Sequence, residues 1–303
     1  MPRPRSLRTA LVRKLLTRPV RWWERNRFYP VKGRIAKLPP LPVCPGARFA
    51  VVVLATPSAM VEAAWTARSL LLHLPPETGL VVAVDGSPKP DAVSQMQAMF
   101  PGCSVIRTSE LVAEIKERAP FIVRLAGYHP MGRKLATILA LQERYDVLFA
   151  DNDVLAFKEM PEILESIRNG VSRNLYLQEI DQVFGAETLF APVHSLHLPY
   201  AGTINVGLLL IRRRSLSLPV AEQILSLSGE IATWFPDTMI LSVLMELAGA
   251  LPLPRSDYVV SVARQFWFEE DVNYAGIRLR HFTGPVRHLL YLKGMPFLHA
   301  SWK

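Results

Sequence analysis

Blocks of hydrophobic and polar residues alternate along the chain and predict strands and helices in turn. Phe49 to Ala55 forms an unbroken apolar run rich in β-branched residues, which is typical of a strand covered on both faces. The next predicted elements are a helix at 60–74, a strand at 79–84, a helix at 91–100, a strand at 104–107 and a helix capped by Ser109 and running to Arg118. The apolar residues 147–150 then predict a further strand. This order predicts an α/β domain with a mainly parallel sheet that binds ligands at the carboxyl ends of its strands.

The second half of the chain has a more mixed pattern. It predicts a helix at 160–169, a strand at 174–178, a loop-rich segment at 184–200, a strand at 203–212 and a helix at 238–248. Residues 278–287 read RLRHFTGPVR, which places His281 at the end of a short strand, Gly284 in a turn and Arg287 at the start of an apolar helix.

Polar residues gather where the predicted strands end. The strand at 147–150 stops at Asp151-Asn152-Asp153, and Asn152 favours a bend that lets both carboxylates face one cation. Carboxylate oxygens hold hard divalent ions while leaving positions open for phosphate oxygens and water. Thr56 and Asp85 come directly after two other parallel strands, so we expect them near the same ligand. The alternative is that the two aspartates only cap the next turn.

Two cations stand near the amino end of a predicted helix at 132–144. Arg133 and Lys134 lie where backbone N–H groups also favour an anion, so they are candidates to hold a phosphate. The alternative is a solvated basic face, which is the commoner use of adjacent cations on a helix.

The strand at 203–212 and the helix after it carry further polar candidates. Asn205 is an amide within an apolar strand, where only a specific partner would satisfy it. Gly207 permits the close approach of a ligand or of another backbone segment. Asp237 comes after Pro236 and is suited to the N-cap of the helix at 238–248.

The positive charge of the chain is concentrated at its amino end. Residues 1–37 hold twelve of the 35 lysines and arginines but only one of the 26 acids. Leucines at helical spacing and Trp22-Trp23 accompany these cations, so we predict an amphipathic basic arm that fits an anionic membrane surface. The alternatives are packing on the domain, a cleaved transit peptide, and contact with a nucleic-acid backbone, which is the weakest of the three.

The remaining composition limits the compartment. Cys44 and Cys103 form neither a metal-binding spacing nor a disulfide framework, which indicates a reducing environment. No apolar run approaches the roughly 18 residues that span a bilayer. We therefore expect a cytoplasmic protein that the arm holds at the inner face of a membrane.

Four motifs, taken in order, resemble the nucleotide-sugar glycosyltransferases of the GT-A fold, especially the family 8 type. They are D-x-D at 151–153, N-x-G at 205–207, Asp237 at a helix start, and H-x-x-G-x-x-basic at 281–287. The resemblance implies a mixed, mainly parallel sheet flanked by helices and a UDP- or GDP-sugar donor with Mn²⁺ or Mg²⁺ on its phosphates. It also implies a glycan or lipid-linked acceptor.

The resemblance divides the chain into two parts. Residues 1–46 would be the basic arm and a proline-rich linker, and residues 47–303 a single catalytic domain. Within that domain, residues 47–153 would bind the nucleotide and residues 154–303 the acceptor.

The resemblance also gives the metal site its residues. Asp151, Asp153 and His281 match the family's metal ligands, and an imidazole ligand favours Mn²⁺ over Mg²⁺. Gly284 would let the backbone approach the diphosphate. Arg287 stands where the family usually has a lysine, and its guanidinium still fits phosphate oxygens.

The remaining motif residues resemble contacts to the donor sugar and acceptor, namely Asn205, Gly207 and Asp237. The family has glutamine after this aspartate, whereas this chain has Thr238, so the retaining stereochemistry usual in family 8 is not implied. Inversion would require a carboxylate base, for which Asp237, Asp181 and Glu179 are the candidates.

Two alternatives from other classes fit parts of the pattern. A phosphohydrolase of the haloacid dehalogenase type also ends a strand in D-x-D, but it normally opens its domain with that strand and carries a later Asp-Asp pair, which this chain lacks. A non-catalytic sugar-nucleotide-binding module would keep the fold without turnover.

Overall fold

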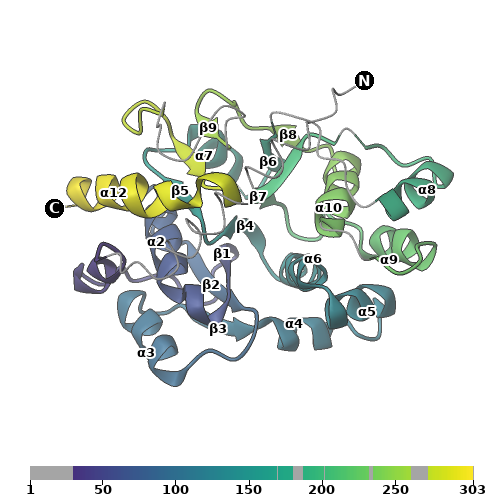
Figure 1. Ribbon diagram of the computed structural model, residues 1–303, viewed down its shortest axis with the longest axis horizontal. Coiled ribbons are helices and arrows are strands. Elements are labelled where there is room, and N and C mark those ends of the chain that lie inside the picture. Colours follow the sequence, from purple (N-terminus) through teal and green to yellow (C-terminus); the bar gives the residue numbers. More distant parts are fainter. Residues whose placement is uncertain are drawn as a thin grey trace, which may run out of the picture.

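The computed structural model describes residues 30–168, 170–179, 187–200, 202–231, 235–260 and 272–302, and a seven-stranded sheet forms the centre of this part (Figure 1). Its strand order is β3 (Ser104–Arg107), β2 (Gly79–Val84), β1 (Phe49–Ala55), β4 (Asp146–Asp151), β7 (Ile204–Ile211), β6 (Leu175–Gln178) and β8 (Leu251–Pro252). The first four strands are parallel, whereas β7 runs antiparallel to both β4 and β6. The amino end of β7 therefore lies at the same edge of the sheet as the carboxyl end of β4.

Helices cover both faces of the sheet, which explains why β1 and β2 carry no polar side chain. Alternate residues of β1 face opposite sides, with Val51 and Val53 on one side and Ala50 and Val52 on the other. The first side packs against α2 (Met60–Leu71) and α3 (Pro90–Met99). The second side packs against α4 (Thr108–Glu114), α5 (Pro120–Tyr128), α6 (Pro130–Leu141), α8 (Glu187–Ser195), α9 (Leu218–Ser226) and α10 (Pro236–Leu247).

A small second sheet lies beside the end of β4. It has the order β5 (Val154–Ala156), β10 (Leu279–His281) and β9 (Tyr258–Val259), and α7 (Pro161–Ile167) comes after β5 in the chain. Only Asn152 and Asp153 separate β4 from β5. The segment after β10 continues through η3 (Gly284–Val286), α11 (Arg287–Leu289), the π-helical turn η4 (Leu290–Gly294) and α12 (Met295–Ser301). The second sheet thus brings the end of the chain to the acidic turn.

The predicted strands at 49–55, 79–84 and 104–107 are confirmed, and those at 147–150, 174–178 and 203–212 are confirmed to within one residue at each end. Three helices differ from the prediction. Residues 120–128 and 218–226 form helices that the sequence pattern does not predict, and α8 occupies the segment predicted to be loop-rich, with Pro192 inside it. The predicted cap at Ser109 is also wrong, because α4 begins at Thr108 and Arg107, two residues before Ser109, takes the N-cap position.

The structure describes the last part of the basic arm and the linker, from residue 30 onward, and this part packs on the domain. Val31, Ile35 and Val43 belong to the core on the α2 side of the sheet, with the short 3₁₀ helix η1 at Lys32–Lys37. Trp65 donates its indole N–H to the carbonyl of Lys32 at 3.1 Å. The predicted amphipathic helix and Trp22-Trp23 lie outside the described residues. Among the helices that the structure does describe, none has the length and apolar character to cross a membrane.

Candidate metal and donor site

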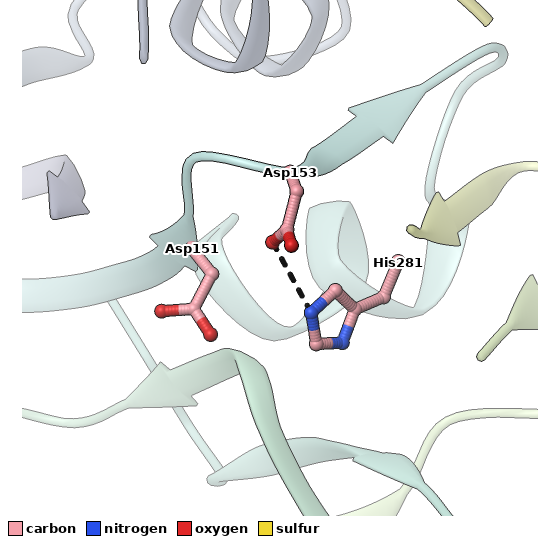
Figure 2. A group of neighbouring side chains, drawn as sticks. All are labelled: Asp151, Asp153 and His281. Carbon is pink, nitrogen blue, oxygen red and sulfur yellow. Dashed lines mark ion pairs between the residues drawn. The ribbon is translucent and has the colours of Figure 1, made fainter. Parts of the chain in front are cut away.

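Asp151, Asp153 and His281 come together where β4 ends. Asp151 is the last residue of β4, and Asp153 precedes β5. His281 pairs with Val154 in the antiparallel register of β10 and β5, and the backbone N–H of Phe282 donates to the carbonyl of Asp153 at 2.8 Å. One ligand atom from each of the three side chains lies within 4.8 Å of the others, and Figure 2 shows the two carboxylates and the imidazole converging on one point.

Asp153 is the most confined carboxylate of this group, with a side chain only 4% exposed. Its Oδ1 lies 3.2 Å from His281 Nε2 but makes no hydrogen bond of normal geometry to any described residue. Burial by itself would raise the pKa of Asp153, but His281 and Arg287 outweigh burial and hold the pKa well below its usual range. Asp153 therefore stays ionised at neutral pH and keeps an oxygen in need of a cation.

This donor set fits a divalent cation. It combines two carboxylates with one imidazole, and carboxylate oxygens and imidazole nitrogen are the protein ligands of ions such as Mn²⁺. The buried Oδ1 of Asp153 is the atom that a bound cation would satisfy. Asp151 is partly exposed, so the group is open to a ligand from one side.

Arg287 pairs with the other carboxylate oxygen of Asp153, Oδ2. Its Nε donates to Asp153 Oδ2 at 3.0 Å, and its Nη2 contacts the same oxygen. The charge on Asp153 raises the pKa of Arg287, which stays a cation. About half of the Arg287 side chain remains exposed, so the guanidinium has a free face. Gly284, three residues earlier, is exposed at the start of η3.

Lys134 joins the acidic turn to Asp237. Its ammonium lies 2.8 Å from Asp151 Oδ2 and 3.9 Å from Asp237 Oδ2. Asp237 is fully buried, and burial raises its pKa to about 6 although Lys134 opposes the shift. The predicted N-cap role of Asp237 is wrong, because it lies within the first turn of α10 and Phe235 takes the N-cap position with a left-handed φ of 74°. A left-handed non-glycine residue is strained, and such strain is common at functional sites.

Asn205 and Gly207 lie on β7 and face His281. The side-chain oxygen of Asn205 is 2.8 Å from His281 Nδ1 and accepts the backbone N–H of Gly207 at 2.9 Å. A Cβ atom on Gly207 would lie 2.2 Å from His281 Nδ1, so only glycine leaves room for this imidazole. The Asn205 amide nitrogen donates to Glu179, which comes directly after β6. Asp181 lies outside the described residues.

The predicted nucleotide contacts at the other strand ends form a separate group. Asp85 comes after β2 and accepts Arg133 Nε at 2.6 Å, while Arg133 Nη1 donates to the carbonyl of Ala126 at 3.1 Å. Thr56 comes after β1 and lies 3.1 Å, oxygen to oxygen, from the hydroxyl of Ser58. No hydrogen bond or ion pair between described residues joins Asp85 or Thr56 to the group of Asp151, Asp153 and His281.

Two residues of the site are not identified by the sequence pattern. Phe235 is half exposed beside Asp237, and the proline after it is the only local signal. Tyr291 donates its hydroxyl to the buried Glu62 at 3.0 Å and lies near Arg287, and burial raises the pKa of Tyr291 so that the phenol stays neutral. Its position four residues after Arg287, on the same side of a helix, is the available signal.

Sequence comparisons give no family for this chain, since no protein-family model and no curated protein matches it. Mouse xyloside xylosyltransferase 1 shares the fold with a TM-score of 0.50 at 13% identity, covering 78% of this chain and 98% of its own. The bifunctional glycosyltransferase WbbM has a TM-score of 0.53 at 12% identity, covering 82% of this chain and 50% of its own. An active-site mutant of LgtC has a TM-score of 0.50 at 14% identity, covering 78% of this chain and 88% of its own. These likenesses, together with the sheet order, confirm the fold class: the chain has the GT-A fold of glycosyltransferases.

Proposed function

We propose that this chain is a metal-dependent glycosyltransferase that moves a sugar from a nucleotide-diphosphate sugar to a hydroxyl of a glycan or lipid-linked acceptor. The observation that carries the proposal is the convergence of Asp151, Asp153 and His281 within 4.8 Å on a GT-A fold. The motif order further supports the family 8 type.

Asp151, Asp153 and His281 would hold the ion, and the imidazole favours Mn²⁺ over Mg²⁺. When bound, a divalent ion would neutralise the charge of the donor diphosphate as a Lewis acid. The D-x-D carboxylates lie at the strand end where a GT-A-type sheet binds ligands, so the donor diphosphate would meet the ion there.

Arg287 and Lys134 are the cations that would stabilise the departing nucleoside diphosphate. Arg287 already lies at the acidic turn, and its exposed face could donate to phosphate oxygens. Lys134 is almost fully buried and held between Asp151 and Asp237, so its charge stays fixed where negative charge would develop.

Asp237 fits two roles, and the stereochemistry of the product distinguishes them. A carboxyl with a pKa of about 6 is largely ionised at neutral pH and is an effective proton acceptor, as inversion would require. A retained anomer would instead support contact between Asp237 and a hydroxyl of the donor sugar. Asp181 and Glu179 remain the other base candidates from the sequence.

The test is thermal stabilisation of the full chain by a panel of UDP- and GDP-sugars with and without Mn²⁺, and then nucleoside diphosphate release in the presence of acceptors. A donor that binds the folded state raises the melting temperature. Asp153→Asn should abolish the Mn²⁺-dependent part of the shift and lower turnover by about 100-fold or more, since even the partners of metal ligands are worth about 10–100-fold. Asp85→Asn, at the end of β2, is the matched control and should keep the Mn²⁺ dependence.

Other outcomes would favour other functions. Release of phosphate from a phosphomonoester, without sugar-nucleotide binding, would support the haloacid dehalogenase alternative. Metal-dependent binding of a sugar nucleotide without turnover on any acceptor would support a binding module.

We also propose that the basic arm holds the protein on an anionic membrane surface, a proposal supported by the cations and tryptophans of residues 1–37. The test is flotation with vesicles containing anionic lipid, comparing the full chain with a chain that lacks residues 1–29. This boundary spares Val31 and Ile35, which pack in the core. Equal flotation of the two chains would contradict the proposal.

A further inference from the structure

Glu179, Asn205 and His281 form a hydrogen-bonded series that leads to Asp153. Glu179 accepts from the amide nitrogen of Asn205, whose oxygen is 2.8 Å from His281 Nδ1. His281 Nε2 in turn lies 3.2 Å from Asp153 Oδ1. The series runs from the loop after β6, through β7, to the end of β10, and Asn205 and His281 are both buried.

The contact with the Gly207 backbone identifies which way the Asn205 amide is turned. A backbone N–H can only donate, so the Asn205 atom 2.9 Å from Gly207 N must be the amide oxygen. The amide nitrogen then points at Glu179, whose carboxylate accepts from it. Glu179 is itself held, because its backbone N–H donates to the carbonyl of Thr203 at 2.8 Å and its carbonyl accepts from Arg255.

This orientation selects one tautomer of His281. The Asn205 oxygen can only accept, so a hydrogen bond at 2.8 Å requires the proton on Nδ1. In the neutral ring, Nε2 then carries a lone pair directed at the orphaned Oδ1 of Asp153. Two buried acceptors facing each other at this distance suit a cation bound by both.

We propose that Glu179 and Asn205 are positioning residues that hold His281 in the Nδ1–H tautomer with Nε2 free to bind the metal, and that Glu179 is not the catalytic base. The inference deepens the proposed function and rests on its metal site. The carboxylate oxygen of Glu179 holds the Asn205 amide, and that amide in turn holds the imidazole with Nε2 toward the candidate metal site.

A pair of substitutions at residue 179 separates positioning from base catalysis. Glu179→Gln keeps a carbonyl oxygen that accepts from Asn205, so Mn²⁺ affinity and turnover should stay within about 3-fold of wild type. Glu179→Leu removes the acceptor and should weaken Mn²⁺ binding about 10–100-fold, as the loss of such partners does elsewhere. Glu77→Leu, an exposed loop glutamate before β2, is the matched control and should leave Mn²⁺ affinity unchanged. Loss of turnover in Glu179→Gln with unchanged Mn²⁺ affinity would overturn the proposal in favour of a base.

The tautomer itself can be observed without metal or donor. Ring ¹⁵N shifts of His281 above pH 8, assigned by their loss in His281→Gln, should show a protonated Nδ1 in the wild-type chain and a mixture of tautomers in Glu179→Leu. An Nε2–H tautomer in the wild type would overturn the inference. Equal Mn²⁺ affinity in wild type and Glu179→Leu would overturn this inference and leave the proposed function standing. A wild-type chain that has the Nδ1–H tautomer but binds no Mn²⁺ would overturn the proposed function.

Discussion

Two parallel strands of the central sheet end in aspartates, and the two ends differ in their surroundings. After β2, Asp85 meets one cation, Arg133, and the hydroxyl of Thr108 at 3.4 Å. After β4, Asp151 and Asp153 meet two cations and an imidazole, and Asp237 lies beyond Lys134.

The difference comes from the path that the chain takes after each strand. The chain leaves β4 through a short acidic turn and starts β5, whose antiparallel partner β10 carries His281. β2 has no such continuation among the described residues. An aspartate at a strand end is therefore a weak indicator of a metal site until a second sheet directs another ligand at it.

The largest expected effect concerns the buried charge beyond the acidic turn. Asp237→Asn should raise the free energy of unfolding at pH 8 by up to about 3 kcal/mol, because the shift in pKa from 3.8 to about 6 measures the cost of burying this carboxylate. Because the pKa of Asp237 is higher in the folded state, its contribution to the free energy of unfolding is fully present below pH 3.8, the unfolded-state pKa. This contribution is lost as the pH rises through about 6. The gain of the variant should therefore vanish near pH 4.

Urea unfolding at pH 4 and pH 8 measures this effect, with Asp85→Asn as the control that should show no such gain. Asp153 has the opposite pH dependence. Because its pKa is lowered in the folded state, its contribution to stability is present above the ordinary pKa of an aspartate and is lost as the pH falls. That contribution is common to wild type and Asp237→Asn and cancels between them. Equal stability of these two chains at pH 8 would show that the charge of Asp237 is well compensated.

The next effect tests how closely β7 approaches His281. Gly207→Ala should destabilise the chain by about 1–3 kcal/mol and weaken Mn²⁺ binding, because a methyl group would overlap the imidazole. Gly229→Ala is the matched control, since a Cβ there meets nothing within 4 Å. Calorimetric Mn²⁺ titration and thermal unfolding of both variants give the comparison, and unchanged binding in Gly207→Ala would place the metal elsewhere.

The smallest effect is expected at the other strand end. Arg133→Lys keeps the positive charge but removes the guanidinium group, which donates to Asp85 and to the carbonyl of Ala126 at the same time. The pair is partly exposed, so we expect a loss of about 1 kcal/mol or less in unfolding free energy and no change in Mn²⁺ affinity. A fall in Mn²⁺ affinity would mean that the two strand ends act as one site.

The central sheet is predictable from the sequence because its strands are apolar runs bounded by turn residues, as in Phe49–Ala55. The short helices are harder to predict from the sequence. α5 is only nine residues long and begins at Pro120, and Pro192 inside α8 argues against a helix there. Tertiary packing outweighs these local preferences, because α5 and α8 both bury apolar residues against the second face of the sheet.

The candidate metal ligands are predictable for a different reason, namely that the D-x-D and H-x-x-G motifs occur in an order that resembles a known family. The side-chain contacts around these residues are not predictable from the sequence. The sequence pattern makes Lys134 a candidate to hold phosphate, yet its ammonium contacts Asp151 and Asp237. Glu179 is a candidate base from the sequence, yet it lies against Asn205. Such contacts depend on the register in which β7 and β10 pair with their neighbouring strands. The local sequence pattern of each strand does not predict this register.

The place of His281 in the chain has a consequence for synthesis. This residue is 130 residues after Asp151, and its strand docks on β5 only after residues 1–281 have been made. Domains fold as units while the ribosome extends them from the amino end. A nascent chain stalled before β10 would therefore carry both aspartates without His281, so an ion that needs all three side chains would bind only after the second sheet has formed.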